Sequence, residues 1–298
     1  MDISLALGGG GVRGAAHIGV LRALENSGFR VRAVAGSSIG SIIGAFYALG
    51  HSPAEIEQKF AALDQSKLFG WPLSDGAGLL GMRGLLDFLR ANFGNKTFDQ
   101  LNLPCAAVAV DLKSNREIIL REGGILDAVL GSSAIPGLFP PREIAPYVLI
   151  DGGVLDPVPV RAARSLAPGL PVVAVSLMPP LESPAIPLTF PVPRPLAERL
   201  TRLHFTQAIQ VFADAIDIGQ REMTELRLSL DRPEVLIRPA LAEINVLDLI
   251  NVAEVARLGE VATLQALPAL KRLDSWPRRL RGWWRELRSG DSFFTVQP

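Results

Sequence analysis

Residues 36–40 carry the pattern in this chain that is most directly connected with chemistry. Gly-Ser-Ser-Ile-Gly follows a short apolar run and precedes a run with helical character. The pattern G-x-S-x-G between a strand and a helix is typical of a nucleophile elbow, a strained turn that holds a serine hydroxyl at a sheet edge. The flanking Gly36 and Gly40 leave room for the neighbouring strand and helix. Ser38 is therefore the candidate nucleophile, although a Gly/Ser-rich turn that merely ends a strand has the same composition.

A second glycine-rich segment, residues 8–14, lies between the first expected strand and the first expected helix. Its sequence is Gly-Gly-Gly-Gly-Val-Arg-Gly. Consecutive glycines can turn several N–H groups toward one point, and a helix N-terminus adds partial positive charge. Such a loop binds an anion. The anion is either a phosphate, as in the G-x-G-x-x-G dinucleotide pattern, or the transient oxyanion formed when a serine attacks an ester.

The end of the second expected strand favours the oxyanion. A dinucleotide site needs an acidic residue there to bind the ribose hydroxyl, but this strand runs into Ala35 and the elbow. The Gly-Lys-Ser/Thr of a Walker-type phosphate loop is absent as well.

The serine needs a proton acceptor, and the three histidines are poor candidates. His17 lies in the first expected helix, where we expect it to brace the packing near the glycine loop. His51 follows the elbow helix, and His204 falls in a later expected helix. We interpret both as structural because neither has an evident acidic partner.

Asp151 remains as the candidate base. It follows an expected strand and precedes Gly152 and Gly153, which permit close approach to another backbone turn. A plain Asp-Gly turn is the alternative interpretation. We interpret Asp111 and Asp156 as structural, because neither lies in a motif that places it opposite the serine.

Taken together, these motifs resemble those of the patatin-like phospholipase family, specifically the short bacterial patatin-like serine esterases. Residues 9–14 match G-G-G-x-[RK]-G, residues 36–40 match G-x-S-x-G and residues 151–153 match D-G-[GA]. Residues 132–141 resemble the serine-to-proline block of the family. The likeness covers roughly residues 1–265, and the order and spacing of the motifs fit.

The resemblance implies a Ser–Asp dyad without histidine, and it implies no metal and no cofactor. The expected fold is α/β: a three-layer α/β/α sandwich with a mixed, largely parallel central sheet. The implied site consists of the nucleophile Ser38, the base Asp151, the oxyanion-hole residues Gly9, Gly10, Gly11 and Arg13, and the supporting glycines Gly36, Gly40, Gly152 and Gly153.

An aspartate is a weak base at neutral pH, because its ordinary pKa is about 4. Burial would raise its basicity, and an oxyanion hole contributes roughly 3 kcal/mol or more of transition-state stabilisation. We therefore expect most of the rate enhancement to come from the glycine loop and from positioning.

Alternating strand and helix patterns predict a parallel sheet with helices on both faces. Because active sites gather at the carboxyl ends of such strands, we expect Gly8, Gly36 and Asp151 to lie on one rim. The expected strands are 3–7, 31–35, 105–112, 117–120, 147–150 and 172–177. The expected helices are 15–27, 38–49, 85–93, 196–228 and 244–267. Gly28 is expected to end the first of these helices.

Composition limits the functional classes. The chain has 298 residues, 48% of them hydrophobic, and its 30 basic residues balance its 30 acidic ones. This balance argues against a nucleic-acid partner. The single cysteine, Cys105, is expected to be a buried thiol, and no metal-ligand spacing is evident. Because no signal peptide is evident, we expect a cytoplasmic location. The uncharged segment 33–54 suits a buried strand-turn-helix better than a membrane span.

We expect two parts, an acyl hydrolase domain over residues 1–270 and a C-terminal tail over residues 271–298. Tryptophans and arginines in residues 271–288 suit a membrane interface, but a packed helix with solvated arginines is an equal alternative. The proline-rich segment 179–195 is favoured as a surface connector over an apolar cover. The sequence therefore leaves open a peripheral contact with the inner face of the membrane through these two segments.

The expected activity is serine-dependent hydrolysis of lipid-like carboxylic esters, phospholipid or lysophospholipid, through an acyl-enzyme. The motifs leave two alternatives open. An alcohol or thiol acceptor in place of water would make the protein an acyltransferase. A membrane-associated regulatory protein with an idle site would retain the same residues.

Overall fold

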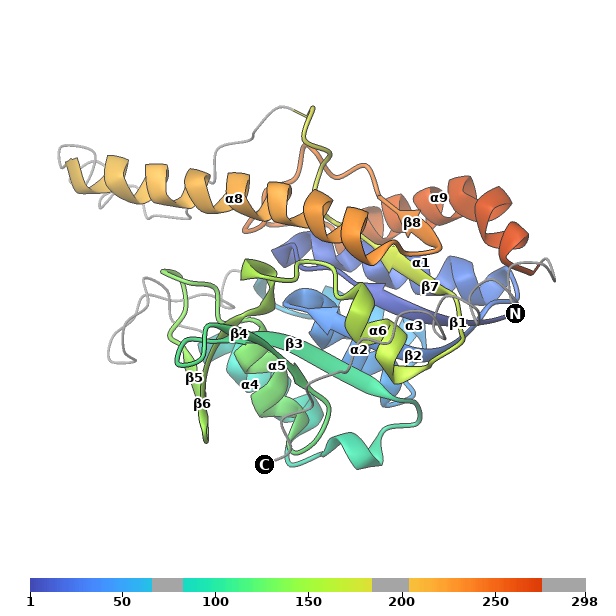
Figure 1. Ribbon diagram of the computed structural model, residues 1–298, viewed down its shortest axis with the longest axis horizontal. Coiled ribbons are helices and arrows are strands. Elements are labelled where there is room, and N and C mark those ends of the chain that lie inside the picture. Colours follow the sequence, from blue (N-terminus) through green and yellow to red (C-terminus); the bar gives the residue numbers. More distant parts are fainter. Residues whose placement is uncertain (66–82, 184–203, 275–298) are drawn as a thin grey trace.

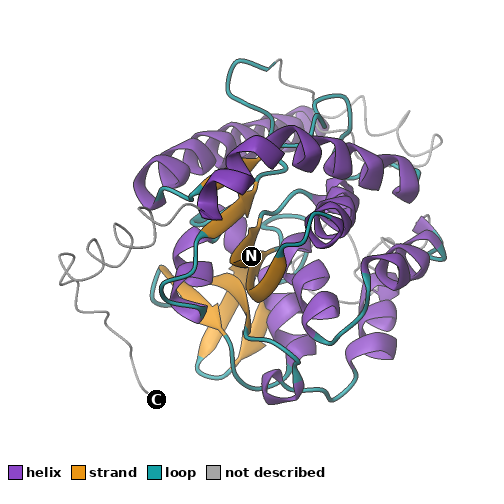
Figure 2. Ribbon diagram, turned by 90° about the vertical axis from the view of Figure 1, so that its right-hand side faces the viewer, coloured by secondary structure: helices purple, strands orange, loops and turns teal. Residues whose placement is uncertain are grey.

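The computed structural model describes residues 1–65, 83–183 and 204–274. In this part of the chain a single mixed sheet lies between two layers of helices (Figure 1). A view turned by a right angle shows the strands in the middle of the molecule with helices around them (Figure 2). The expected three-layer α/β/α sandwich is confirmed.

The sheet contains a parallel part and an antiparallel part. Strands β3 (Cys105–Asp111), β2 (Arg30–Ser37), β1 (Asp2–Leu7), β7 (Val172–Val175) and β8 (Val235–Ile237) are parallel neighbours in that order. Strands β4 (Arg116–Leu120) and β6 (Tyr147–Asp151) pair antiparallel with β3, and β5 (Arg142–Ile144) pairs antiparallel with β6. Sequence analysis missed β5 and β8, since three residues are too few to show a period.

One helical layer consists of α1 (Ala15–Asn26), α2 (Ile39–Ala48), α3 (Pro53–Ala61), α4 (Arg83–Phe93), α5 (Ile125–Ser132) and α9 (Val252–Lys271). The other consists of α6 (Val160–Leu166) and α8 (His204–Asp231). The sequence did not predict α3, α5 or α6.

Helix ends differ from the expected ones for local reasons. Helix α9 begins at Val252 rather than at residue 244, because the side chain of Asn251 caps it by accepting from the N–H groups of Ala253 and Glu254. Helix α1 ends before Gly28, whose φ of 82° suits a glycine there. Of the helix expected over 196–228, residues 196–203 lie outside the described part.

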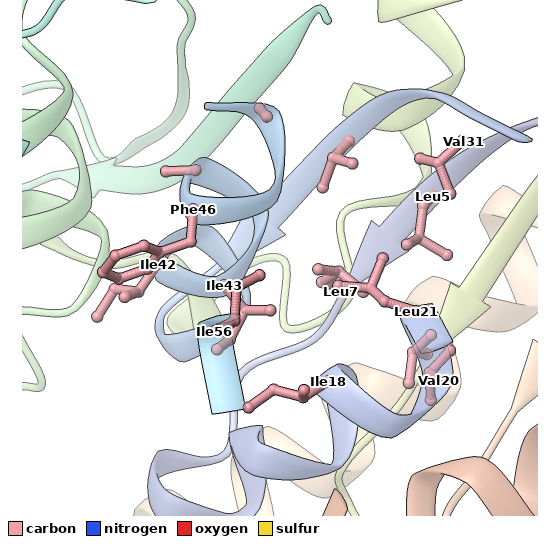
Figure 3. Close-up of a cluster of buried hydrophobic side chains, with 14 of the residues drawn as sticks. Leu5, Leu7, Ile18, Val20, Leu21, Val31, Ile42, Ile43, Phe46 and Ile56 are labelled. Carbon is pink, nitrogen blue, oxygen red and sulfur yellow. The ribbon is translucent and has the colours of Figure 1, made fainter. Parts of the chain in front are cut away.

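The hydrophobic cores on the two faces of the sheet differ in the size of the side chains that the strands contribute. On one face large side chains from β1, α1 and α2, among them Leu5, Leu7, Ile18 and Phe46, pack together (Figure 3). On the other face the strands present small residues such as Ala6 and Ala35, against which α6 packs. The alternation along β1, large on one side and small on the other, follows from the two-residue period of a strand.

The centre of the sheet contains a break at which two strands meet end to end. One edge of β3 is occupied by β4, which pairs with residues 107–111. The other edge is shared: β2 pairs with it up to Ser37 opposite Val108, and β6 pairs from Asp151 opposite Ala109 onward. Because β2 and β6 run in opposite directions, their carboxyl ends face each other across this break.

Segment 33–54 forms the end of β2, the elbow and α2, as expected for a buried strand-turn-helix. In the described ranges no helix has the length and apolar character needed to cross a bilayer. Of the segments expected to contact a membrane, residues 184–195 and 275–288 lie outside the described part.

Candidate active site

Ser38 occupies a strained turn between β2 and α2. Its φ of 53° and ψ of −127° lie in a region that non-glycine residues rarely adopt. The glycines on either side allow the turn to pack tightly. A β-carbon on Gly36 would lie 2.3 Å from the backbone of Gly40, and one on Gly40 would lie 2.1 Å from the carbonyl oxygen of Leu7. The turn therefore has the geometry of a nucleophile elbow.

The carboxylate of Asp151 lies at the end of β6, facing the elbow across the break in the sheet. It is buried, with 2% of its surface exposed. Its Oδ1 accepts a 2.7 Å hydrogen bond from the N–H of Gly153. Burial raises the pKa of Asp151 to about 6, even though the side chain of Ser38 and the N–H of Gly153 act to lower it.

The two glycines after Asp151 allow the chain to turn close to β3. A β-carbon on Gly152 would lie 2.2 Å from the carbonyl oxygen of Val108, and one on Gly153 would lie 3.0 Å from the Asp151 carboxylate. Glycine is therefore required at position 152, where a side chain would collide with the backbone of β3, and favoured at position 153, where a side chain would crowd the Asp151 carboxylate.

The glycine loop lies beside the elbow, since a β-carbon on Gly9 would be 3.2 Å from Cβ of Ser38. The N–H of Gly9 donates to the carbonyl of Pro157 at 3.0 Å. Gly10 and Gly11 have φ values of 155° and 57°, and within the described ranges their N–H groups donate to no protein acceptor. These two N–H groups are therefore available to an oxyanion, whereas that of Gly9 is engaged.

The side chain of Arg13 is 2% exposed and extends away from solvent. Its Nε donates a 2.6 Å hydrogen bond to the carbonyl of Ile244, and the N–H of Val12 donates to the carbonyl of Val246. Burial lowers the pKa of Arg13, an effect that nearby Asp217 opposes. Arg13 thus ties the glycine loop to the segment before α9, and a direct contribution of its charge to an oxyanion stays a prediction.

Comparison with known proteins identifies the family of the chain. Residues 5–164, more than half of the chain and including all four motifs, match the profile of the family described as patatin-like phospholipase. The chain belongs to the patatin-like phospholipase family.

Two relatives illustrate the range of the match. An uncharacterised NTE family protein of Mycobacterium tuberculosis is 37% identical over 177 residues, which are 59% of this chain and 49% of that protein. Patatin-like phospholipase domain-containing protein 6 of Homo sapiens is 32% identical over 174 residues, which are 55% of this chain and 12% of that protein. The chain thus spans about half the length of the mycobacterial relative. The crystal structure of VipD from Legionella pneumophila aligns with 90% of this chain and 67% of its own at 15% identity and a TM-score of 0.48.

In this patatin-like domain the two histidines whose side chains are described lie away from Ser38 or serve as supports. His17 is fully buried, and its Nε2 donates to the carbonyl of Gly8 at 2.8 Å, so it braces the glycine loop. Burial lowers the pKa of His17 to about 4, which keeps the ring neutral. His51 packs on Phe46, beyond the opposite end of α2 from the elbow. The side chain of His204 lies outside the described part.

The other two acidic residues considered from the sequence are held by local contacts. Asp111 accepts hydrogen bonds from the N–H groups of Ser114 and Val148, which outweigh the effect of desolvation and lower its pKa to about 2. Asp156 is fully buried and forms an ion pair with Arg227 at 3.1 Å. Cys105 is buried, and burial raises its pKa to about 12. The described residues contain no group of side chains suited to hold a metal ion.

One residue beside Ser38 was not singled out by sequence analysis. Ser132, at the end of α5, is 0% exposed and its Oγ accepts a 3.0 Å hydrogen bond from the N–H of Ser38. The available signal was its place at the start of the serine-to-proline block, which the motif alone does not connect with the elbow.

Proposed function

We propose that this protein is a serine acyl hydrolase that cleaves lipid-like carboxylic esters, phospholipid or lysophospholipid, with Ser38 as nucleophile and Asp151 as base. The observation that carries the proposal is the buried carboxylate of Asp151, which faces the Ser38 elbow across the break in the sheet and has a pKa of about 6. A carboxylate with this pKa is mostly ionised at neutral pH and is a stronger base than an exposed aspartate.

In the first step the Oγ of Ser38 attacks the ester carbonyl carbon and its proton passes to the Asp151 carboxylate. The carbonyl oxygen becomes an oxyanion, which the free N–H groups of Gly10 and Gly11 stabilise. The tetrahedral intermediate then collapses. Its bond to the alcohol breaks, and the departing oxygen takes the proton from Asp151. The product of this step is an acyl-enzyme on Ser38.

In the second step a water molecule attacks the acyl-enzyme and gives its proton to Asp151. Collapse of the second intermediate breaks the bond to Oγ of Ser38, which recovers its proton from Asp151, and the fatty acid leaves. Asp151 at pKa about 6 is still a far weaker base than an alkoxide. For that reason we assign most of the rate enhancement to the glycine loop and to the fixed geometry of the elbow.

A fluorophosphonate probe together with p-nitrophenyl esters and phospholipid vesicles tests this function. Wild type is expected to be labelled and to release p-nitrophenol and fatty acid, whereas Ser38→Ala is expected to do neither. Ser229→Ala, at an exposed position of α8, is the control and should behave as wild type. Labelling and turnover by Ser38→Ala would contradict the assignment, and an unreactive wild type would favour an idle site. Product analysis with added alcohol acceptors separates hydrolysis from acyl transfer.

Peripheral membrane contact through residues 179–195 and 271–288 stays part of the proposal, supported by the tryptophans and basic residues of the tail. Deletion of residues 271–298 is expected to weaken binding to anionic vesicles. Unchanged binding would remove the tail from the proposal.

A further inference from the structure

The break in the sheet leaves backbone groups that no strand partners. Within a continuous ladder each N–H and C=O has a neighbour, and buried groups without one are costly. At the break β2 has ended opposite Val108 and β6 has not yet begun to pair. The carbonyl of Val108, the N–H of Ser38 and the N–H of Asp151 all lie there and need other partners.

The segment 132–134 at the end of α5 supplies all three partners. The Oγ of Ser132 donates a 2.6 Å hydrogen bond to the carbonyl of Val108 and accepts a 3.0 Å hydrogen bond from the N–H of Ser38. Two residues later, the carbonyl of Ala134 accepts a 2.9 Å hydrogen bond from the N–H of Asp151. One short segment therefore holds the backbones of both proposed dyad residues.

The direction of the Ser132 hydroxyl is fixed by its partners. The carbonyl of Val108 can only accept, so the hydroxyl proton points toward it and a lone pair remains for the N–H of Ser38. Ser132 is fully buried, so bulk water does not compete for either bond. Of the three contacts that close the break, the side chain of Ser132 makes two. One of these holds the N–H of Ser38, the residue whose φ of 53° needs to be held.

We infer that Ser132 is a positioning residue of the active site, one that holds the strained backbone of Ser38 in register with Asp151. This inference rests on the proposed function. Ser132 does not touch the substrate, and it engages the N–H of Ser38, which leaves the oxyanion to Gly10 and Gly11. Its removal should therefore slow the chemical step more than it weakens substrate binding.

Ser132→Ala tests the inference, with Ser133→Ala as the matched control. Ser133 is the next residue and 5% exposed, but within the described part of the chain its hydroxyl has no hydrogen-bond partner. With p-nitrophenyl butyrate, we expect Ser132→Ala to lower kcat by about 100-fold with little change in KM, as expected for a displaced reacting group. Ser133→Ala should stay within about twofold of wild type in both constants, since its hydroxyl makes no contact to lose.

Ser132→Thr keeps the hydroxyl and should recover most of the lost kcat. If Ser132→Ala does not fold, Ser132→Cys keeps the volume but makes only weak hydrogen bonds, and it should show the same selective loss of kcat. Kinetic constants of the folded alanine or cysteine variant that match those of Ser133→Ala would overturn the inference.

The Ser38→Ala variant separates failure of this inference from failure of the proposed function. If Ser38→Ala still turns over substrate, the proposed function itself fails. If Ser38→Ala is inactive and Ser132→Ala is normal, the role of Ser132 alone fails.

Discussion

At the level of single residues, the burial that suits Asp151 to its proposed role as base opposes stability. Burial raises its pKa from 3.8 to about 6, so the folded protein binds a proton more tightly than the unfolded chain does. The resulting stabilisation is fully present below pH 3.8 and is lost as the pH rises through about 6. At neutral pH the folded protein therefore holds a carboxylate in an environment that disfavours its charge.

Asp151→Asn should abolish turnover and at the same time stabilise the fold at neutral pH. Asparagine keeps an oxygen that accepts from Gly153 but carries no charge to desolvate. A pKa shift of this size corresponds to about 3 kcal/mol of additional unfolding free energy at neutral pH, and the difference should vanish as the pH approaches 3.8. Urea unfolding at both pH values measures it.

Asp111→Asn is the matched control for this effect, because hydrogen bonds lower the pKa of Asp111 to about 2. Its carboxylate stabilises the fold above the ordinary aspartate pKa, so its replacement should destabilise the protein at neutral pH. An Asp151→Asn variant less stable than wild type at neutral pH would contradict the account of Asp151.

The pH dependence of turnover should follow Asp151 directly. A protonated carboxyl cannot accept the proton of Ser38, so kcat/KM for a soluble p-nitrophenyl ester should fall below a pH of about 6, approaching tenfold per pH unit. His17, with a pKa of about 4, is neutral across this range. A profile that is flat between neutral pH and pH 5 would show that the base is a different group.

At the level of elements, the packing of α1 against α9 depends on direct contact between the two helix backbones. Helices α1 and α9 cross at Gly19 and Gly259. A β-carbon on Gly19 would lie 1.7 Å from the carbonyl oxygen of Ala256, and one on Gly259 would lie 1.9 Å from that of Ala16. The two backbones thus approach more closely than any side chain would permit, and α9 is held against the first βα unit.

Gly19→Ala should destabilise the protein by about 1–3 kcal/mol or more, because the added methyl group forces the helices apart. Gly219→Ala is the control. Gly219 lies in the exposed face of α8, and among the described residues no atom beyond its own stretch of helix lies within 4 Å of its β-carbon position. There the higher helix propensity of alanine should stabilise by about 0.5–1 kcal/mol. Urea midpoints of the two variants should move in opposite directions, and equal shifts would contradict the close crossing.

At the level of the whole molecule, a buried charge cluster joins the layers. Arg227 of α8 pairs with Glu117 of β4, with Asp156 after the Asp-Gly-Gly turn and, at 3.8 Å, with Asp231. Desolvation and the charge of Glu117 raise the pKa of Asp156. One arginine thus balances several acids between α8, the sheet and the chain that carries Asp151.

Arg227→Met should destabilise the fold by about 3–5 kcal/mol at neutral pH, because it leaves buried carboxylates without a counter-charge. The loss should shrink as the pH is lowered and the acids take up protons. Arg30→Met, which removes a pair with Asp2 from a side chain 71% exposed, is the control and should change stability by about 0–1 kcal/mol. Equal effects of the two substitutions would contradict the role of the cluster.

The sequence alone determined the local chemistry and much of the architecture. The spacing of glycines around Ser38 and in residues 8–14 located the elbow and the glycine loop in the sequence, because few residues other than glycine adopt such backbone conformations. Apolar periodicity gave the main strands and helices, although it missed the three-residue strands and several helices. The family resemblance supplied the pairing of Ser38 with Asp151, since no local pattern connects residues so far apart.

The tertiary structure decided how these parts meet. The sequence predicted Gly8, Gly36 and Asp151 on one rim of parallel strands, but Asp151 arrives on the antiparallel strand β6, whose end faces that of β2 along β3. Burial of Asp151, the free N–H groups of the glycine loop and the hydroxyl of Ser132 on the elbow all depend on this arrangement. Strand direction and register are set by contacts between distant segments, and such contacts leave no periodic trace in the chain.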